Sequence, residues 1–226
     1  RLHVHTLASP KIDGMQATLV TRHEKDIPVA LLNLDRRGEM YAVTAIAVSG
    51  GGDTVLHGEL VWPVFYPFDA SVLSGERVVQ LPYAERIRKM QQMPAPRLHP
   101  VRIEHKYFVQ GPTPQQLEQM LYCHVSDGIM LHGPKYDFKY KQQHTIDLLA
   151  NGKGDMLTRD NKCVSHGGEK LPKNSVWECM CDGSVIKQRT DKKTANTHMV
   201  VNEIQQAQAD GITVHELAQQ LGTEAP

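Results

Sequence analysis

The amino-acid sequence predicts an α+β protein, in which a larger antiparallel-sheet domain precedes a smaller β domain with a helical tail. Three observations predict this class. Short runs of β-type composition fill much of the first half, several later stretches show apolar residues at helical spacing, and the composition changes after residue 148. We place the boundary there, which gives domains 1–148 and 149–226.

Four segments of the first half have the composition of β-strands. Turn-forming residues separate them, notably Arg36-Arg37-Gly38 and the stretch from Ser49 to Asp53. Consecutive strands joined by short links pair antiparallel. We therefore expect an antiparallel sheet built from Ala17 to Val20, Val29 to Leu32, Met40 to Ala47 and Val55 to Val61.

Two helices are predicted after these strands. Apolar residues recur at helical spacing from Tyr83 to Met93, and Pro94-Ala95-Pro96 ends the pattern. A second helix is expected to begin at Thr113, because Pro114 suits the first helical position.

The second half begins with loops and ends with helices. Gly, Lys, Asn and Pro dominate from Leu149 to Ser175, which indicates loops or a hinge. Two strands, Val176 to Met180 and Ser184 to Arg189, then flank a turn, and together they predict a reduced OB-type barrel. Helices are expected from His198 to Ala209 and from Thr213 to Leu221.

Composition narrows the class of partner. The 226 residues are 40% hydrophobic, which suffices for an ordinary core, and Lys plus Arg (25) balance Asp plus Glu (25). A neutral chain is a poor candidate for coating long nucleic acids, so we expect contact with a short segment only. Four cysteines, too few for a disulfide framework, indicate a reducing compartment. Neither a membrane span nor a signal peptide is expected.

A series of short motifs carries the chemistry. Lys11-Ile12-Asp13-Gly14 opens it and, taken alone, would equally fit a solvated lysine before an Asp-Gly turn. The order and spacing of the later motifs favour a functional interpretation. They are His57-Gly58-Glu59-Leu60-Val61, Phe65-Tyr66-Pro67-Phe68-Asp69, Asp127-Gly128-Ile129-Met130-Leu131, Lys139-Tyr140-Lys141 with Thr145-Ile146-Asp147, and Arg189-Thr190-Asp191-Lys192.

This series resembles the motifs of the covalent nucleotidyltransferases, the superfamily of ATP-dependent polynucleotide ligases and GTP-dependent mRNA capping enzymes. Two of these motifs are similar to those of the RNA guanylyltransferase branch: Thr145-Ile146-Asp147, and Arg189-x-Asp191-Lys192 followed by Asn196. The resemblance spans residues 7 to about 200. It implies a nucleotidyltransferase domain followed by an OB-like domain, and an activity in which a lysyl-GMP intermediate, formed from GTP, passes GMP to the 5′-diphosphate end of RNA.

Lys11 is the expected nucleophile, and it must attack the α-phosphate as a neutral amine. Lys139 and Lys141 are expected to face the site together, because residues two apart on a strand point the same way. Neighbouring cations disfavour the ammonium form of Lys11 and stabilise charge on the phosphate. A solvated strand face is the competing interpretation for the paired lysines.

The resemblance also assigns acidic and aromatic residues. Asp127 is the leading ligand for Mg²⁺ or Mn²⁺, and Glu59 is a second acid near the metal or ribose. Taken alone, Asp127 would also fit a turn and Glu59 an exposed strand residue, but their spacing favours the functional interpretation. Phe68, or alternatively Tyr66, would stack on the purine, against the simpler interpretation that both are core. Asp69 is expected to be structural or to lie near the ribose.

A further set of residues is implied to bind the nucleotide. Arg189 and Lys192 would grip the β- and γ-phosphates, since the planar fork of arginine suits phosphate oxygens, and the loops before them would act as a hinge. A solvated charge cluster is the alternative. The resemblance adds Asp13, Asp147 and Asp191 to this set.

Some residues depart from the family pattern or suggest other chemistry. Gln16 stands where the family usually has arginine, and His57 stands where it commonly has aspartate, so nucleotide affinity and base choice stay open. A zinc site made of Cys163-x-x-His166 and Cys179-x-Cys181 is an alternative use of those residues. Its spacing is not standard, and reduced core cysteines explain Cys179 and Cys181 more simply.

Two other functions are kept as alternatives. One is an ATP-dependent RNA or DNA ligase that uses a lysyl-AMP intermediate, and the other is a catalytically silent domain that binds nucleotide or RNA in a capping assembly. The expected partners are GTP, the 5′ end of RNA and, because the chain begins at Arg1 close to the lysine motif, other domains of a larger capping protein. The chain is expected in the nucleus or cytoplasm, or as a domain of a viral protein.

Overall fold

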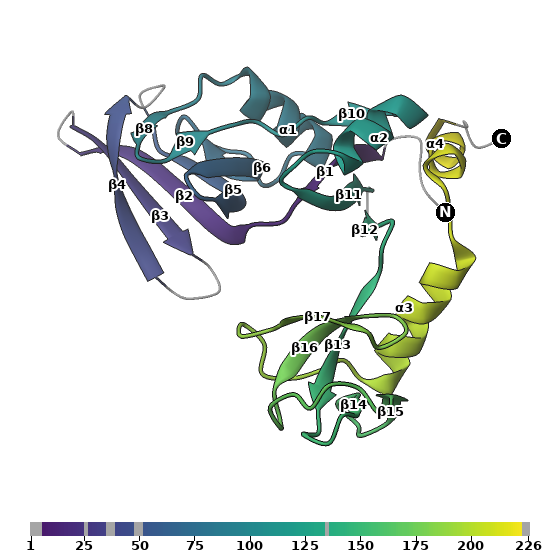
Figure 1. Ribbon diagram of the computed structural model, residues 1–226. Helices are drawn as coiled ribbons and strands as arrows, with labels where there is room; N and C mark the ends of the chain where they lie inside the picture. Colours follow the sequence, from purple (N-terminus) through teal and green to yellow (C-terminus); the bar gives the residue numbers. More distant parts are fainter. Residues whose placement is uncertain (1–5, 25–26, 35–38, 48–51, 134–135, 223–226) are drawn as a thin grey trace. The chain divides into compact units, whose positions relative to one another are not determined.

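The computed structural model describes residues 6–24, 27–34, 39–47, 52–133 and 136–222. The chain forms two compact units (Figure 1). The first contains Arg1–Tyr140 and Val214–Pro226, and the second contains Lys141–Thr213. Among the described residues, no helix is long and apolar enough to cross a membrane. The turn predicted at residues 36–38, and most of the one predicted at 49–53, lie outside the described residues.

The two units differ from the predicted domains at both ends of the second unit. The second unit begins at Lys141 rather than after residue 148, because β13 (Thr145–Ala150) pairs with β16 (Val176–Met180) from Thr145↔Met180 to Leu149↔Val176. The final helix belongs to the first unit, because its apolar side chains pack there. The second unit is therefore an insertion between two parts of the first.

The larger sheet of the first unit is antiparallel along its main path, as the sequence predicts. The four predicted strands are present and longer than expected. However, β5 (Thr54–Val61) pairs with β2 (Met15–Glu24) rather than with its predecessor β4 (Glu39–Ala47). A short β9 (Arg102–Ile103) pairs parallel with β6 (Val64–Leu73). The strand order is β7 (Glu76–Arg77), β6 (Val64–Leu73), β5 (Thr54–Val61), β2 (Met15–Glu24), β3 (Ile27–Leu34), β4 (Glu39–Ala47) and β8 (Arg97–His99).

One face of this sheet forms the main core. Alternate residues of β5 are buried, which is the period-2 pattern of a strand with one covered face. The helix α1 (Tyr83–Gln92), predicted from its apolar spacing, contributes the buried side chains Ile87 and Met90 to the core cluster that also contains Leu19, Leu56 and Phe65.

A second sheet in the first unit carries the lysine motif. Its order is β10 (Val109–Gln110), β1 (Leu7–Ile12), β11 (Ser126–His132) and β12 (Asp137–Tyr140). The pairing of β1 with β11 is antiparallel, and its register shifts between Pro10 and Ile12. Lys11 therefore lies at an irregularity of the kind that redirects a side chain.

Two helices pack against this sheet. The helix α2 (Pro114–Leu121) begins where the sequence predicts, and Thr113 and Gln116 form a reciprocal capping box. The helix α4 (Val214–Gly222) packs on α2, and one apolar cluster joins both helices to the sheet. That cluster consists of Ala8, Leu117, Met120, Ile129, Leu131, Val214, Leu217, Ala218 and Leu221.

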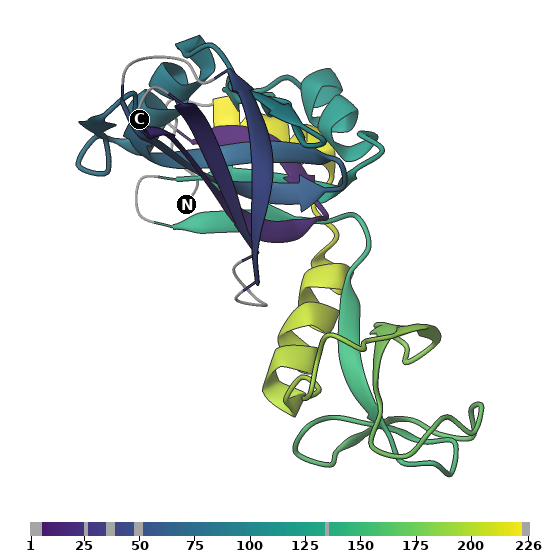
Figure 2. The ribbon, with the colours of Figure 1, turned by 90° about the vertical axis from the view of Figure 1, so that its left-hand side faces the viewer.

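The second unit is a five-stranded antiparallel sheet beside a helix. The strand order is β15 (Cys163–Ser165), β14 (Met156–Leu157), β13, β16 and β17 (Val185–Gln188). The helix α3 (His198–Asp210) runs along β13 (Figure 2) and packs Val201 and Ile204 against Ile146 and Leu148. Within the described residues no strand pairing joins β15 to β17, so the OB-like barrel stays a prediction.

We expect Leu217→Ala in α4 to destabilise the first unit by about 2–4 kcal/mol, because it removes a fully buried side chain from the cluster under β1 and β11. Hydrogen exchange of the β1 and β11 amides should report the loss of protection. Gln220→Ala, an exposed change on the same helix, is the control. Loss of protection confined to the second unit would contradict the assignment of α4.

Candidate active site

The predicted nucleophile forms an ion pair with the predicted metal ligand. The Lys11 Nζ atom lies 2.5 Å from Asp127 Oδ1, and the side chains are 17% and 29% exposed respectively. The two residues come from adjacent strands β1 and β11, at the register shift where Pro10 faces Ile129 and Ile12 faces Ser126. Strand pairing thus brings together residues that are 116 positions apart.

Glu59 lies on β5 and contacts the turn that follows the lysine. The Gly14 amide donates a hydrogen bond to Glu59 Oε2 at 3.2 Å, and Glu59 faces Gln16 across β2 and β5. Burial raises the pKa of Glu59, an effect that the positive charges of Lys106 and Lys11 oppose. Position 14 must be glycine, because a Cβ there would stand 2.9 Å from the Leu60 carbonyl oxygen. Glu59, Lys11 and Asp127 therefore share one electrostatic environment.

Lys106 is a second buried cation at this site, and the motif analysis missed it. Its side chain is only 7% exposed, and its Nζ lies 5.8 Å from the ring centroids of both Phe68 and Phe108. Burial lowers the pKa of Lys106 to about 8, while Glu59 opposes that change and Lys11 reinforces it. In the sequence Lys106 stands out only as a lysine beside the aromatic residues Tyr107 and Phe108, a pattern that a solvated segment can also show.

The structure separates the two candidates for the aromatic platform. Tyr66 is 8% exposed and packs with Ile12 and Val64, so it belongs to the core. Phe68 is only partly buried and lies beneath the Lys106 ammonium. Phe68 is therefore the better placed of the two to contact a ligand.

Asp69 and its neighbours hold the Phe68 segment in place. Both Asp69 oxygens accept hydrogen bonds from Arg86, at 2.7 and 2.8 Å, and the Tyr83 hydroxyl donates to the Phe68 carbonyl oxygen at 2.7 Å. Arg86 and Tyr83 lie on α1. Of the two roles expected for Asp69, the structural one explains these contacts.

The paired lysines do not lie on one strand. β12 ends at Tyr140, so Lys139 is an exposed strand residue opposite Met130, whereas Lys141 begins the second unit. The strand alternation that was expected to direct both ammonium groups together therefore does not apply. The assignment of both lysines to one strand is wrong because the sequence pattern does not show where a strand stops, and the joint approach of the two lysines to the site stays a prediction.

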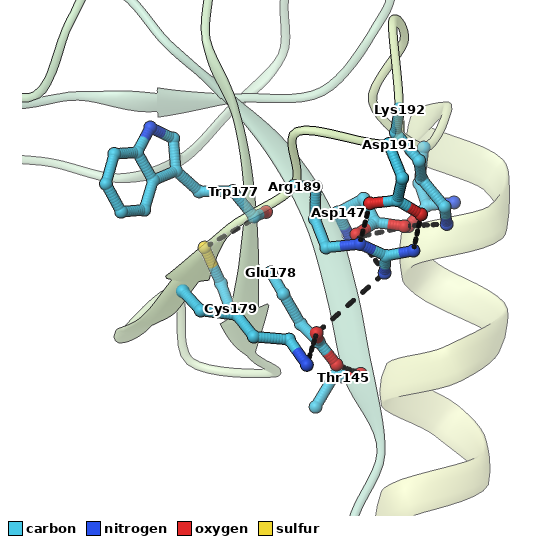
Figure 3. A network of polar contacts seen from close by, with 10 residues as sticks. Thr145, Asp147, Trp177, Glu178, Cys179, Arg189, Asp191 and Lys192 are labelled. Carbon is cyan, nitrogen blue, oxygen red and sulfur yellow. Dashed lines mark hydrogen bonds and ion pairs between the residues drawn. The ribbon is translucent and has the colours of Figure 1, made fainter. Parts of the chain in front are cut away.

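Residues of the other predicted set meet within the second unit (Figure 3). Arg189 pairs with Asp147 at 3.1 Å, and its Nε and Nη2 atoms donate to the two Asp191 oxygens at 2.9 and 2.8 Å. Lys192 binds the other Asp147 oxygen, and Glu178 Oε2 lies 3.8 Å from Arg189. The Asn196 side chain accepts from the Asp147 amide at 2.6 Å.

This network gives Arg189 a structural role in the second unit. Asp147 is 8% exposed, so its negative charge requires the cations beside it. The hydrogen bonds from Arg189 hold the pKa of Asp191 well below its usual range. A phosphate could bind the Arg189 fork only by replacing these carboxylates.

The residues that depart from the family pattern have local explanations. Both ring nitrogens of His57 form hydrogen bonds, one with Thr18 Oγ1 at 3.3 Å and one with Ser71 Oγ at 2.6 Å. These contacts connect β2, β5 and β6. Asp13 and Gln16 are exposed, and the Asp13 amide donates to the Val125 carbonyl oxygen at 2.8 Å.

The four-ligand zinc alternative is not assembled. Cys179 is fully buried in the core of the second unit, where burial raises the pKa of its thiol to about 12. The Cys181 thiol points to the His144 carbonyl oxygen at 3.4 Å. Cys163 and His166 instead lie next to Asp155.

Comparison with known proteins shows the fold. The chain is similar to a solved structure described as mycobacterial DNA ligase D complexed with ATP and MES, with a TM-score of 0.52 and 14% sequence identity. The match covers 85% of this chain and 92% of that chain. No protein-family model and no curated protein sequence matches. The α+β arrangement, with its antiparallel sheets, is therefore one that a nucleotide-binding ligase also adopts.

The low pKa of Lys106 predicts how stability depends on pH. Between pH 8 and 10.5 the native chain holds fewer protons at Lys106 than the unfolded chain does, so the penalty for burying this charge disappears as the pH rises. The unfolding free energy of the wild type, relative to Lys106→Met, should increase by about 3 kcal/mol or less over this range. Urea unfolding at several pH values tests this. Lys170→Met, a change at an exposed lysine, is the control, and a flat difference for Lys106→Met would contradict the burial of a charged amine.

The ion-pair network predicts that Arg189→Ala destabilises the second unit by about 1–3 kcal/mol, because it leaves Asp147 and Glu178 short of a partner. Unfolding can be followed by Trp177 fluorescence in a Trp62→Phe background. Lys187→Ala is the matched control, since Lys187 also pairs with Glu178 but is 63% exposed, and it should cost under about 0.5 kcal/mol. Equal, small effects would show that the network contributes little to folding.

Proposed function

We propose that this chain is an mRNA guanylyltransferase domain. Lys11 Nζ attacks the α-phosphorus of GTP, the N–P bond forms as the bond to the bridging oxygen breaks, and pyrophosphate leaves. The lysyl-GMP then passes GMP to the 5′-diphosphate end of RNA. The observation that supports this most directly is the part-buried contact between Lys11 and Asp127, beside Glu59 and Lys106.

The carboxylate of Asp127 supports a nucleophilic lysine by holding its amine in one direction. The contact is short, and Asp127 Oδ1 is in position to take the proton that the Lys11 ammonium must lose before its neutral amine attacks. The pair is partly buried, which limits the access of water to the amine. Lys106 adds positive potential where phosphate charge would develop.

The acidic groups fit a divalent cation. Asp127 and Glu59 present carboxylate oxygens at one site, the donor type that Mg²⁺ or Mn²⁺ prefers, and burial and, to a lesser extent, the negative charge of Asp127 raise the pKa of Glu59. When bound by them, the ion would neutralise negative charge on the triphosphate. Lys11 is then left to act as the nucleophile.

Lys106 supports the choice of GTP over ATP. It lies over Phe68, the aromatic ring proposed to stack on the base. Guanine presents two acceptors, O6 and N7, on one edge, whereas adenine presents an amino donor beside N7. A lysine ammonium can only donate hydrogen bonds, so a base stacked near Phe68 should bind more tightly when its edge carries hydrogen-bond acceptors.

The second unit is proposed to act on the leaving group. Arg189 and Lys192 would exchange Asp147 and Asp191 for the β- and γ-phosphates, and the small sheet would serve as a reduced OB-type module. Other domains of a larger capping protein would supply or receive the RNA end.

A second candidate is an ATP-dependent ligase. The solved structure with a similar fold is a DNA ligase complexed with ATP, and the Lys11 chemistry would be the same with AMP. A silent nucleotide-binding domain is the third, and Gln16 and His57 are the residues that favour it.

Labelling distinguishes these functions. We expect protein incubated with Mg²⁺ and GTP labelled at the α-phosphate to retain label after denaturation, to lose it in acid as a phosphoramidate does, and to lose it in Lys11→Ala. Lys170→Ala, an exposed lysine change, should label normally. Label from ATP alone would replace the capping proposal with the ligase, and no label from either nucleotide would favour the silent domain.

The base preference has its own readout. Lys106→Met should reduce labelling by GTP relative to labelling by ATP by about 10-fold or more, the scale of one base-edge contact. An unchanged ratio would remove Lys106 from base selection while leaving the lysyl-nucleotide proposal intact.

A further inference from the structure

Three side chains with different metal-binding groups meet at one end of the small sheet, in the second unit. The Cys163 thiol lies 3.3 Å from His166 Nδ1, and the same nitrogen lies 3.1 Å from Asp155 Oδ1. All three donor atoms lie within 4.8 Å of one another. The predicted nucleotide chemistry uses none of these residues.

The strand pairing explains why these residues meet. β14 and β15 are antiparallel, with Met156 opposite Ser165. Asp155 directly precedes β14 and His166 directly follows β15, so the two lie side by side at the same end of the ladder. The Cys163 thiol reaches toward that end, since it contacts the Ser165 carbonyl oxygen at 3.2 Å.

The donor set and its spacing suit zinc. Thiolate, imidazole and carboxylate are its usual protein ligands, and with Zn–S about 2.3 Å and Zn–N or Zn–O about 2.0 Å, neighbouring donors of a tetrahedral ion stand about 3.3–3.6 Å apart. The two distances of 3.3 and 3.1 Å need only small changes to reach that spacing. Cys163 and His166 are exposed, so an ion can enter from solvent.

The surrounding loop already orients the carboxylate. The Asn151 side-chain Nδ2 donates to Asp155 Oδ2 at 2.7 Å, which leaves Oδ1 directed at His166. The Asn151 Oδ1 in turn accepts from the Asp155 backbone amide at 3.1 Å. Such outer contacts fix ligands in metal sites.

A backbone contact closes the loop just beyond the ligands. The Gly168 amide donates to the Gly154 carbonyl at 2.8 Å. Gly154 has φ +101°, and a Cβ there would lie 2.7 Å from the Gly168 oxygen, so only glycine fits. The segments carrying Asp155 and His166 are therefore held together.

We propose that Asp155, Cys163 and His166 form a zinc site with three protein ligands and solvent in the fourth position. The ion joins the chain before β14 to the chain after β15, and so stabilises the edge of the second unit. This site differs from the set of three cysteines and one histidine considered from the sequence, because Asp155 takes the place of Cys179 and Cys181.

Cobalt provides the most direct test, because Co²⁺ bound to a thiolate has an intense charge-transfer absorption. The full chain, free of affinity tags and stripped with a chelator, is titrated with Co²⁺ and then with Zn²⁺ in competition with a chromophoric chelator. We expect a thiolate-to-cobalt band that Zn²⁺ removes, with saturation at one ion per chain, and a higher unfolding temperature in the presence of Zn²⁺. Absence of the band would overturn the proposal.

Matched variants identify the ligands. Cys163→Ser should abolish the band, and Asp155→Asn and His166→Asn should each weaken Zn²⁺ binding by at least about 100-fold, since even outer contacts cost 10- to 100-fold. Cys181→Ser, a nearby thiol outside the cluster, should bind as the wild type does. A band that survives Cys163→Ser, or one lost in Cys181→Ser, would assign the metal to other residues and refute the site. Metal-free unfolding of each variant separates loss of a ligand from loss of the fold.

Discussion

The pairing of β1 with β11 is the constraint on which the candidate active site depends. Lys11 and Asp127 face each other only because these strands are adjacent and because the register shifts beside Lys11. The ion pair cannot hold the strands by itself, since a part-exposed pair contributes little to folding. The apolar cluster beneath it, from α2 and α4, supplies that stability. The geometry of the two polar residues therefore depends on the apolar side chains of Leu117, Met120, Leu217 and Leu221.

The two units use charged groups in different ways. In the first unit two lysines, Lys11 and Lys106, lie close to two carboxylates, Asp127 and Glu59. Burial shifts Lys106 and Glu59 toward their neutral forms. Groups with such shifts can change protonation state at little cost, which suits a site of proton and phosphate transfer. In the second unit Arg189 is instead paired with three carboxylates, and its partner Asp191 is stabilised in the charged form. That arrangement resists change, so it suits a framework that must remain intact.

The sequence predicted the secondary-structure elements better than the contacts between residues that are far apart in the chain. The helices at Tyr83, Thr113, His198 and Thr213 follow from local apolar spacing, proline and capping residues, and the structure has helices at each position. Lys106 could not be identified in this way, because its burial depends on Phe68 and Phe108 approaching it from elsewhere in the chain. Lys139 and Lys141 were assigned to one strand because the two-residue period of side chains along a strand does not show where the strand ends. Asp155 carried no signal either, since its approach to His166 depends on the register of β14 and β15.

The return of the chain from the second unit to α4 has a consequence for synthesis. The ribosome completes every strand of the second unit, and α3, before it makes the helix that finishes the cluster under β1 and β11. Domains generally fold as units while the chain emerges. Residues 141–213 can therefore reach their native structure while the lysine-bearing sheet still lacks one of its two covering helices. The nascent protein would acquire its inserted framework before its Lys11–Asp127 pair, which is supported fully only once residues 214–222 have left the exit tunnel.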